Sequence, residues 1–158
     1  MSVTIRRARP GDETSIAEFA IKLFEQHIAY EPKRFSIFAT VEGAERFYRS
    51  RFDTAESAVM VATLGERVIG FAYVEKDELN YAALLENAAW LHDIYVDDTS
   101  RHSGAGRGLL EASIEVARKL GASKLMLSVP ARNTAAKKFF EEAGFVTTMH
   151  EMMLAVDG

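Results

Sequence analysis

Apolar and polar residues follow two rhythms along this chain, and the rhythms predict its strands and helices. Strict alternation is typical of a half-buried strand, whereas apolar residues three and four positions apart are typical of an amphipathic helix. Alternation, or a short run of branched and aromatic residues, predicts strands over residues 3–8, 57–64, 67–76, 90–96 and 124–129. The helical spacing predicts helices over residues 13–28, 42–52, 104–120 and 133–143.

Capping residues and two further segments complete this picture. Asp12 and Asn133 stand where helix N-caps are expected, and Gly121 and Gly144 stand where helices end. Residues 77–88 suit a short helix by composition but a long hairpin connection by their place between strands, and both interpretations stay open. Residues 145–156 predict one or two closing strands.

The order of the predicted elements indicates an α/β (α+β) fold. A hairpin-rich first half is followed by a β-α-β second half, which predicts a mixed central sheet with helices on both faces. Strands 90–96 and 124–129 should be parallel neighbours, because a helix joins them. A length of 158 residues fits one domain spanning residues 1–158.

Composition and charge narrow the function classes. Hydrophobic residues make up 48% and charged residues 27% of the chain, as in ordinary globular proteins, and the net charge of −4 argues against nucleic acid as a partner. The absence of cysteine excludes disulfides, cysteine nucleophiles and thiolate metal sites. The N-terminal residues show no signal sequence and no apolar run is long enough to span a membrane, so we expect a cytoplasmic protein without a membrane partner.

The stretch "RHSGAGRG", residues 101–108, lies between the strand "WLHDIYV" and the helix that begins at residue 104. The first N–H groups of a helix lack partners and carry a partial positive charge, so they can bind an anion. Gly104 and Gly106 would let these groups approach a phosphate, and Arg101 and Arg107 would add charge. The stretch therefore predicts a site for a pyrophosphate.

Three phosphate-binding patterns compete for this loop. The dinucleotide pattern G-x-G-x-x-G fits Gly104 and Gly106, but its third glycine position holds Leu109, and the acidic residue expected at the end of the next strand is missing. The Walker pattern needs a Gly-Lys pair, which the chain lacks. The spacing R-x-x-G-x-G is met by Arg101, Gly104 and Gly106.

With these motifs, the chain resembles the GNAT superfamily of acyl-CoA-dependent N-acyltransferases. The resemblance covers nearly the whole chain in element order, and it is most specific in "LHDIYVDDTSRHSGAGRGLL" and "NTAAKKFFEEAGF". Within the superfamily, "LHDIYV" looks like the corresponding strand of the polyamine (spermidine/spermine-type) acetyltransferases. The resemblance implies acetyl-CoA as cosubstrate, a small and cationic amine as acceptor, and no metal.

The resemblance also implies which residues bind the cosubstrate. The pyrophosphate would lie on the loop N–H groups of His102, Ser103, Gly104, Ala105, Gly106 and Arg107, with Arg101 beside them. Ile94, Tyr95 and Val96 would offer backbone groups to the acetyl carbonyl and to the pantetheine arm, which enters where two parallel strands splay apart. Asn133, Ala136 and Phe140, on the helix of the second motif, complete the cosubstrate site.

Acetyl transfer requires a neutral amine, and this need points to residues 92 and 93. An alkylamine has a pKa near that of lysine, about 10.4, so a base or a desolvated pocket must remove a proton. The polyamine branch has a glutamate where this chain has His92, and an imidazole changes charge near neutral pH. We expect His92 to act as the base, and Asp93 to hold the substrate ammonium or to orient a water.

The position of the general acid departs from the family pattern. The family usually has a tyrosine that protonates the leaving thiolate where this chain has Phe140. A missing acid costs ~10²–10⁴-fold in rate, but a thiol with a pKa near 8.5 leaves tolerably as the thiolate. Tyr95 or an ordered water are candidate substitutes.

Each candidate also has a plain structural interpretation. The glycines could serve only a tight turn, the arginines could be solvated, and Asn133 could be only a helix cap. His92 could be a packed strand histidine bonded to a neighbour, Asp93 a carboxylate that anchors a backbone turn, and Tyr95 a residue of the core or of the sheet surface. A rival function is a non-catalytic acyl-CoA-binding domain that has lost its acid at Phe140, and a more distant one is a general nucleotide-binding protein. A homodimer is expected by analogy alone.

Overall fold

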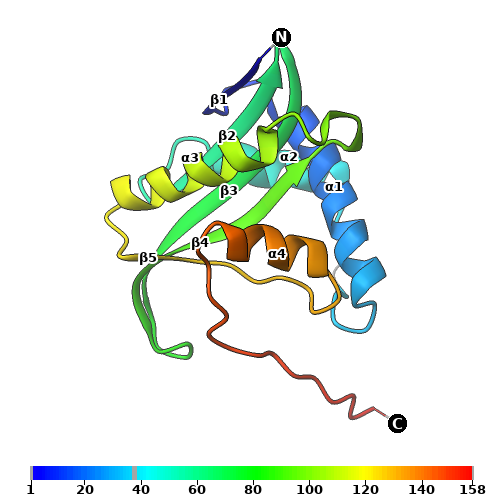
Figure 1. Ribbon diagram of the computed structural model, residues 1–158, viewed down its shortest axis with the longest axis vertical. Coiled ribbons are helices and arrows are strands. Elements are labelled where there is room, and N and C mark those ends of the chain that lie inside the picture. Colours follow the sequence, from blue (N-terminus) through cyan, green and yellow to red (C-terminus); the bar gives the residue numbers. More distant parts are fainter. Residues whose placement is uncertain (1, 37–38, 158) are drawn as a thin grey trace. The chain divides into compact units, whose positions relative to one another are not determined.

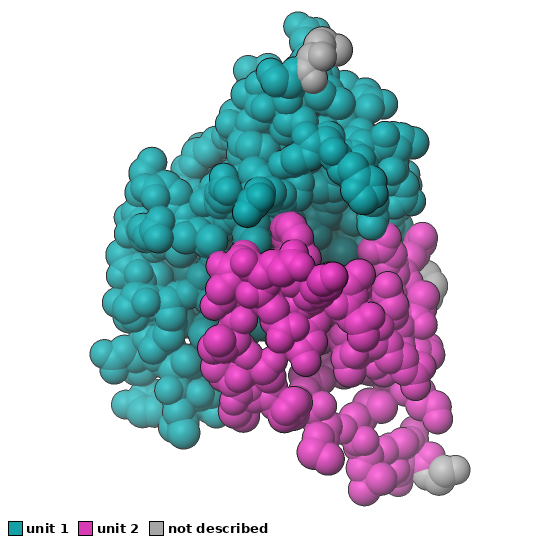
Figure 2. Space-filling model, viewed as in Figure 1, with its two compact units in different colours: residues 1–23, 39–128 teal, residues 24–38, 129–158 magenta. Residues whose placement is uncertain are grey.

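A computed structural model describes residues 2–36 and 39–157. The chain forms two compact units, coloured separately in Figure 2. Unit 1 holds the described residues 2–23 and 39–128, and unit 2 holds residues 24–36 and 129–157. That one acetyltransferase domain spans residues 1–158 stays a prediction.

Unit 1 is built on a five-stranded mixed sheet (Figure 1). In sheet order its strands are β1 (Val3–Arg7), β2 (Ser57–Leu64), β3 (Arg67–Asn80), β4 (Leu85–Val96) and β5 (Lys124–Met126). The first three pairings are antiparallel and the β4–β5 pairing is parallel. The predicted mixed sheet, with parallel strands joined by a helix, is confirmed.

The predicted helices form close to their expected bounds. They are α1 (Glu13–Tyr30), α2 (Val41–Ser50), α3 (Ala105–Lys119) and α4 (Thr134–Glu142), and a short 3₁₀ helix, η1 (Asp98–Ser100), precedes α3. Gly121 and Gly144 have φ angles of 82° and 105° at the predicted helix ends, in the left-handed region that glycine adopts at little cost.

Helices cover both faces of the sheet in unit 1. On one face, the ring of Tyr48 from α2 lies edge-on to Phe71 of β3, with centroids 5.4 Å apart. Gly70 precedes Phe71 and faces the opposite way, because side chains alternate along a strand. A β-carbon built on Gly70 would lie 3.3 Å from Leu109 Cδ1 of α3. Helix α3 therefore packs on the second face, as predicted.

The ambiguous residues 77–88 form a long hairpin rather than a helix. Strand β3 continues to Asn80 and β4 begins at Leu85, with pairs such as Asp77 with Ala88 and Leu79 with Glu86. Cross-strand hydrogen bonds override the helical composition here.

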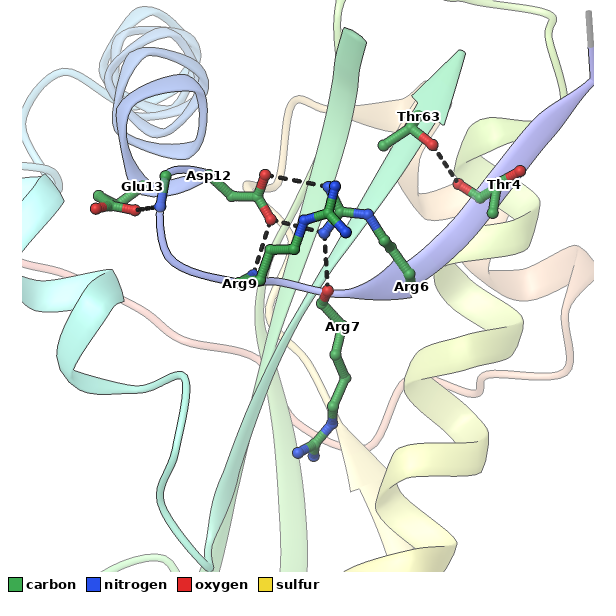
Figure 3. Close-up of polar contacts among 8 residues, drawn as sticks. Thr4, Arg6, Arg7, Arg9, Asp12, Glu13 and Thr63 are labelled. Carbon is green, nitrogen blue, oxygen red and sulfur yellow. Dashed lines mark hydrogen bonds and ion pairs between the residues drawn. The ribbon is translucent and has the colours of Figure 1, made fainter. Parts of the chain in front are cut away.

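Asp12 joins the end of β1 to the start of α1 (Figure 3). Its side chain accepts hydrogen bonds from Arg6 Nη1 at 2.7 Å and from the Arg9 N–H at 2.8 Å. The carboxylate is thus bound to residues that precede it, whereas the sequence predicted a cap on the helix that follows. Burial raises the pKa of Asp12, but its hydrogen bonds to Arg6 and Arg9 outweigh burial and hold it below the usual value.

At the C-terminal end, one predicted strand forms but is shorter than expected, and the prediction of closing strands is wrong. Strand β5 ends at Met126 instead of residue 129, and residues 145–157 form no strand. An alternating pattern makes a segment suitable for a sheet, but a strand exists only where a neighbour completes its hydrogen bonds. No helix within the described residues is long and apolar enough to cross a membrane.

Candidate active site

A β-bulge at His92 shapes the middle of β4. Tyr73 pairs with Asp93 and the next residue of β3, Val74, pairs with Leu91, so His92 is an extra residue without a partner on β3. A bulge bends its strand and redirects a side chain, and bulges are common beside active sites. His92 is exposed, and its ring stacks on that of Tyr73 with centroids 5.2 Å apart.

Asp93 is bound by a tyrosine from α2. The Tyr48 hydroxyl donates a hydrogen bond of 2.7 Å to Asp93 Oδ2. Burial raises the pKa of Asp93 above its usual value, although the Tyr48 hydrogen bond and the nearby His92 both act to lower it. Burial and the adjacent carboxylate raise the pKa of Tyr48, so it stays protonated and donates to the Asp93 carboxylate.

Aromatic rings extend on either side of His92. The Phe47 ring lies 5.6 Å from that of Tyr73, and the Trp90 ring lies 6.4 Å from that of His92. Together with the Tyr73–His92 stack, these contacts form a continuous row of four rings: Phe47, Tyr73, His92 and Trp90. We call this the aromatic row. Aromatic faces attract cations, so such a row suits a positively charged group.

A pair of opposite charges lies near the aromatic row. Arg51, the C-cap residue of α2, forms an ion pair with Glu75 of β3 at 3.2 Å, and its guanidinium also lies 5.0 Å from the centre of the Phe47 ring. Burial, followed by the charge of Glu75 and a hydrogen bond to it, raises the pKa of Tyr73.

Strands β4 and β5 part just before the bulge. Their parallel pairing covers only Ala88 to Trp90 on β4. Beyond Trp90, β4 has no β5 partner within the described residues, so part of its backbone is free to bind another chain-like molecule. Ile94 and Val96, predicted to contact the pantetheine arm, lie on the part of β4 that pairs with β3 but not with β5, and both are partly exposed.

The glycine-rich loop leads into an open helix N-terminus. Gly104 is the N-cap of α3, with φ at 90° and no side-chain cap hydrogen bond, and a β-carbon built there would meet no atom within 4 Å. His102 also has a positive φ, 67°. The Ala105 N–H donates to Ser103 Oγ at 3.3 Å. No acidic residue lies in the first turn of α3, which favours an anion.

Both arginines of the loop region have acidic partners nearby. Arg101 forms an ion pair with Asp98 at 2.9 Å, and Arg107 forms one with Glu111 at 3.6 Å. Such exposed pairs are weak, so either arginine can exchange its carboxylate for a phosphate.

Tyr95 is buried, which bears on its predicted role as a proton donor. It is 4% exposed, and its ring lies 5.6 Å from that of Phe19 on α1. Burial, with Asp98 and Asp97 nearby, raises its pKa, while Arg101 acts in the opposite direction. A higher pKa makes the hydroxyl a weaker acid, and its role as the general acid stays a prediction.

The predicted residues of α4 belong to unit 2. Asn133 is the N-cap of the helix, and its Oδ1 accepts a hydrogen bond of 3.1 Å from the Ala136 N–H. The predicted cap is confirmed. Phe140 is buried, with its ring 5.3 Å from that of Phe139 and 5.7 Å from that of Phe145.

The structure thus groups the unit 1 candidates around β4 and the start of α3, and it adds residues that the sequence did not single out. By its helical spacing, Tyr48 belongs to the apolar stripe of its helix, and no motif singles it out. The adjacent polar pair His92 and Asp93 interrupts the alternation of β4, and this was the one sequence signal of the bulge. Within the described residues, no group of three or more histidine, aspartate or glutamate side chains could hold a metal ion.

Comparison with known proteins decides the family. The model of the acetyltransferase (GNAT) family matches residues 20–145. This chain belongs to that family. As a GNAT protein, it is an acyl-CoA-dependent N-acetyltransferase.

Individual relatives agree with this assignment. An uncharacterised N-acetyltransferase of Bacillus subtilis, YhfO, is 27% identical over 143 residues, which is 90% of this chain and 89% of the relative. The ribosomal protein bS18-alanine N-acetyltransferase of Escherichia coli K12 is 34% identical over 84 residues, 51% of this chain and 57% of the relative. A solved structure of the aminoglycoside N-acetyltransferase AAC(6')-Iy with CoA is similar in fold, with a TM-score of 0.74 and 15% identity, covering 99% of this chain and 95% of that one.

Proposed function

We propose that this protein transfers the acetyl group of acetyl-CoA to the primary amine of a small, cationic acceptor by direct attack in a ternary complex. The observation that carries the proposal is the bulge of β4, which presents His92 and Asp93 side by side where β4 leaves its parallel neighbour. A base and an anion at that point suit an amine that must be bound and then deprotonated.

The cosubstrate fits the residues around β4 and the start of α3. The uncapped, open N-terminus of α3 at Gly104 suits a pyrophosphate. From Ile94 to Val96, β4 is paired with β3 but has no β5 partner within the described residues, and this free edge suits the amides of a pantetheine arm. We propose that Asn133, Ala136 and Phe140 contact the same arm, since they match the family's second motif.

We propose that His92 removes the proton that the amine must lose. The imidazole takes the ammonium proton and releases it to solvent. The neutral amine nitrogen then attacks the thioester carbonyl carbon and forms the C–N bond, the C–S bond breaks to release CoA as the thiolate, and the second N–H proton that the nitrogen loses passes to the same imidazole. Because the chain has no cysteine to carry the acetyl group, direct attack is the simplest route.

A general acid is not required by this scheme. Phe140 cannot donate a proton, and Tyr95 is a weakened acid because burial raises its pKa. A thiolate whose conjugate acid has a pKa near 8.5 leaves without complete proton transfer, and solvent can protonate it afterwards.

The acceptor class is proposed from the charge and shape of the site. Asp93 and the aromatic row together favour an ammonium group. This agrees with the resemblance to the polyamine acetyltransferases and with the aminoglycoside enzyme of similar fold, whereas the bS18-alanine enzyme modifies a protein. A cytoplasmic location and a homodimer also remain proposals.

One experiment tests the function against its rivals. Release of the CoA thiol is measured over a panel of diamines, polyamines, aminoglycosides, amino acids and peptides with a free N-terminus, beside the affinity for acetyl-CoA. Turnover of cationic small amines supports the proposal. Tight acetyl-CoA binding without any turnover supports the non-catalytic domain, and equal binding of nucleotides that lack pantetheine supports the nucleotide-binding protein.

A further inference from the structure

Tyr48 is held rigidly between α2 and the sheet. It is 2% exposed, and its ring meets those of Phe47, Phe71 and Tyr73 edge-on, with centroid distances of 5.2, 5.4 and 5.9 Å. The helix that carries it is itself capped, since Thr40 Oγ1 accepts a 3.0 Å hydrogen bond from the Gly43 N–H. With ring and helix both fixed, the hydroxyl can point only where the packing directs it.

That hydroxyl occupies one oxygen of Asp93 and leaves the other available. Tyr48 donates to Oδ2 at 2.7 Å, and no described side chain donates to Oδ1. A carboxylate that accepts a hydrogen bond on one oxygen is fixed in rotation, so the direction of its second oxygen is fixed too. The outcome is an oriented anion beside the exposed ring of His92.

We infer that Tyr48 is a positioning residue of the acceptor site: by holding Asp93 through Oδ2, it directs Oδ1 toward the ammonium of the acceptor. This inference rests on the proposed function and adds to it the residue that selects a charged acceptor. Tyr48 itself does not contact the acceptor, because Asp93 transmits its effect.

The charges around Asp93 favour a cationic acceptor. From β4 it faces His92, from α2 it faces Tyr48, and from β3 it faces Tyr73. The nearby cation, Arg51 at the C-cap of α2, is already paired with Glu75 at 3.2 Å. Burial opposes the ionised form of Asp93, and an ammonium group would supply the missing counter-charge.

Loss of the Tyr48 hydroxyl should shift the pH dependence of acceptor binding in one direction. The Tyr48 hydrogen bond acts to lower the pKa of Asp93, so Tyr48→Phe raises that pKa. Only the carboxylate binds an ammonium, and acceptor affinity is lost as the pH falls through the pKa of Asp93. In Tyr48→Phe this loss therefore begins at a higher pH.

The test compares Tyr48→Phe with wild type, using the amine of the panel that wild type turns over best. We expect the KM for that amine to rise at least about fivefold, the acid limb of kcat/KM to move to higher pH, and the KM for acetyl-CoA to stay unchanged. Tyr81→Phe is the control, because it also removes one tyrosine hydroxyl, at a turn where the residue is 82% exposed. It should leave the KM for the amine and the pH profile unchanged.

A second variant separates positioning from packing. Asp93→Asn can still accept from Tyr48 but carries no charge, so its acceptor KM should also rise, and adding Tyr48→Phe to it should cost little more. If Tyr48→Phe keeps the wild-type KM and pH profile, or if the two effects simply add, the inference is overturned while the proposed function stands. If Tyr48→Phe fails to fold, an unchanged acceptor KM in Asp93→Asn overturns the inference. If wild type turns over no amine, the proposed function fails and the inference fails with it.

Discussion

The rings of Tyr73 and His92 stack with their centroids 5.2 Å apart and their planes inclined by 27°. This contact exists because the bulge gives β4 one residue more than β3 at this point, so that His92 is inserted next to Asp93, the partner of Tyr73. The stack limits the rotation of an exposed imidazole and directs it over the same face as Asp93.

Replacement of His92 should remove a catalytic base. We expect His92→Ala to lower kcat/KM by ~10²–10⁴-fold and to alter the pH profile of kcat/KM, because the base is lost. The measurement is thiol release from acetyl-CoA between pH 5 and 9. His150→Ala, at an exposed position of unit 2, is the control and should keep the wild-type profile. A normal pH profile in His92→Ala would show that this imidazole is not the base.

A side chain at Gly104 should obstruct the cosubstrate. Gly104 has φ at 90° and open space around it, so Gly104→Val adds bulk where a pyrophosphate is proposed, and we expect the Kd for acetyl-CoA to rise at least about tenfold. Gly106→Val should act in the same direction. Isothermal titration calorimetry gives the affinities.

Gly11→Val is the matched control for strain. Gly11 has φ at 105° and nothing within 4 Å of a built β-carbon, so the backbone cost of about 1–2 kcal/mol should be alike. If both variants weaken acetyl-CoA binding equally, strain accounts for the result and the assignment of the loop fails.

The sequence predicted the fold of unit 1 well because its strong patterns are local. Strands β1 and β2 and all four helices form within a few residues of the predicted bounds. The errors fall where structure depends on a distant partner. Residues 145–157 alternate as a strand does, yet no ladder forms on them, and β5 ends where β4 leaves it, at the Trp90–Met126 pair.

In the candidate site too, local sequence signals were informative and contacts between distant residues could not be predicted. Glycine spacing indicated the loop around Gly104 as a candidate, and the resemblance to the polyamine acetyltransferases indicated His92 and Asp93. The Tyr48–Asp93 hydrogen bond joins residues 45 positions apart, and no spacing rule reaches that far. In sequence, Tyr48 is indistinguishable from any other apolar residue of its helix.

Asp12 should make the stability of the protein depend on pH in the acidic range. Its pKa is held below the usual 3.8, with burial opposing and the hydrogen bonds from Arg6 and Arg9 prevailing. A carboxyl with a lowered folded-state pKa contributes stability above its unfolded pKa, and this contribution is lost as the pH falls through the folded value. The chain should therefore lose stability below about pH 4.

Asp12→Asn checks this assignment. We expect it to lower the free energy of unfolding by about 1.5–3 kcal/mol at pH 7, the usual range for a hydrogen bond to a charged group, and to flatten the loss of stability below pH 4. Urea unfolding at several pH values measures both effects. An identical acid dependence in the variant and in wild type would assign the acid sensitivity to other carboxyls.

Gly70 should tolerate no side chain, because β3 and β4 approach each other closely there. A β-carbon on Gly70 would lie 2.5 Å from the carbonyl oxygen of Tyr95 and 3.2 Å from Val96 Cα, and backbone atoms cannot move aside without displacing β4. We expect Gly70→Ala to lower the free energy of unfolding by about 3 kcal/mol. We also expect it to weaken acetyl-CoA binding, since the displaced residues are those proposed to meet the pantetheine arm.

Gly108→Ala is the informative comparison, because its β-carbon would meet only the flexible side chain of Ile5, at 3.0 Å, and alanine favours a helix by roughly 1 kcal/mol over glycine. Thermal unfolding should rank Gly108→Ala close to wild type and Gly70→Ala far below it, and equal stability of the two variants would mean that β3 and β4 are not packed at Tyr95 as described.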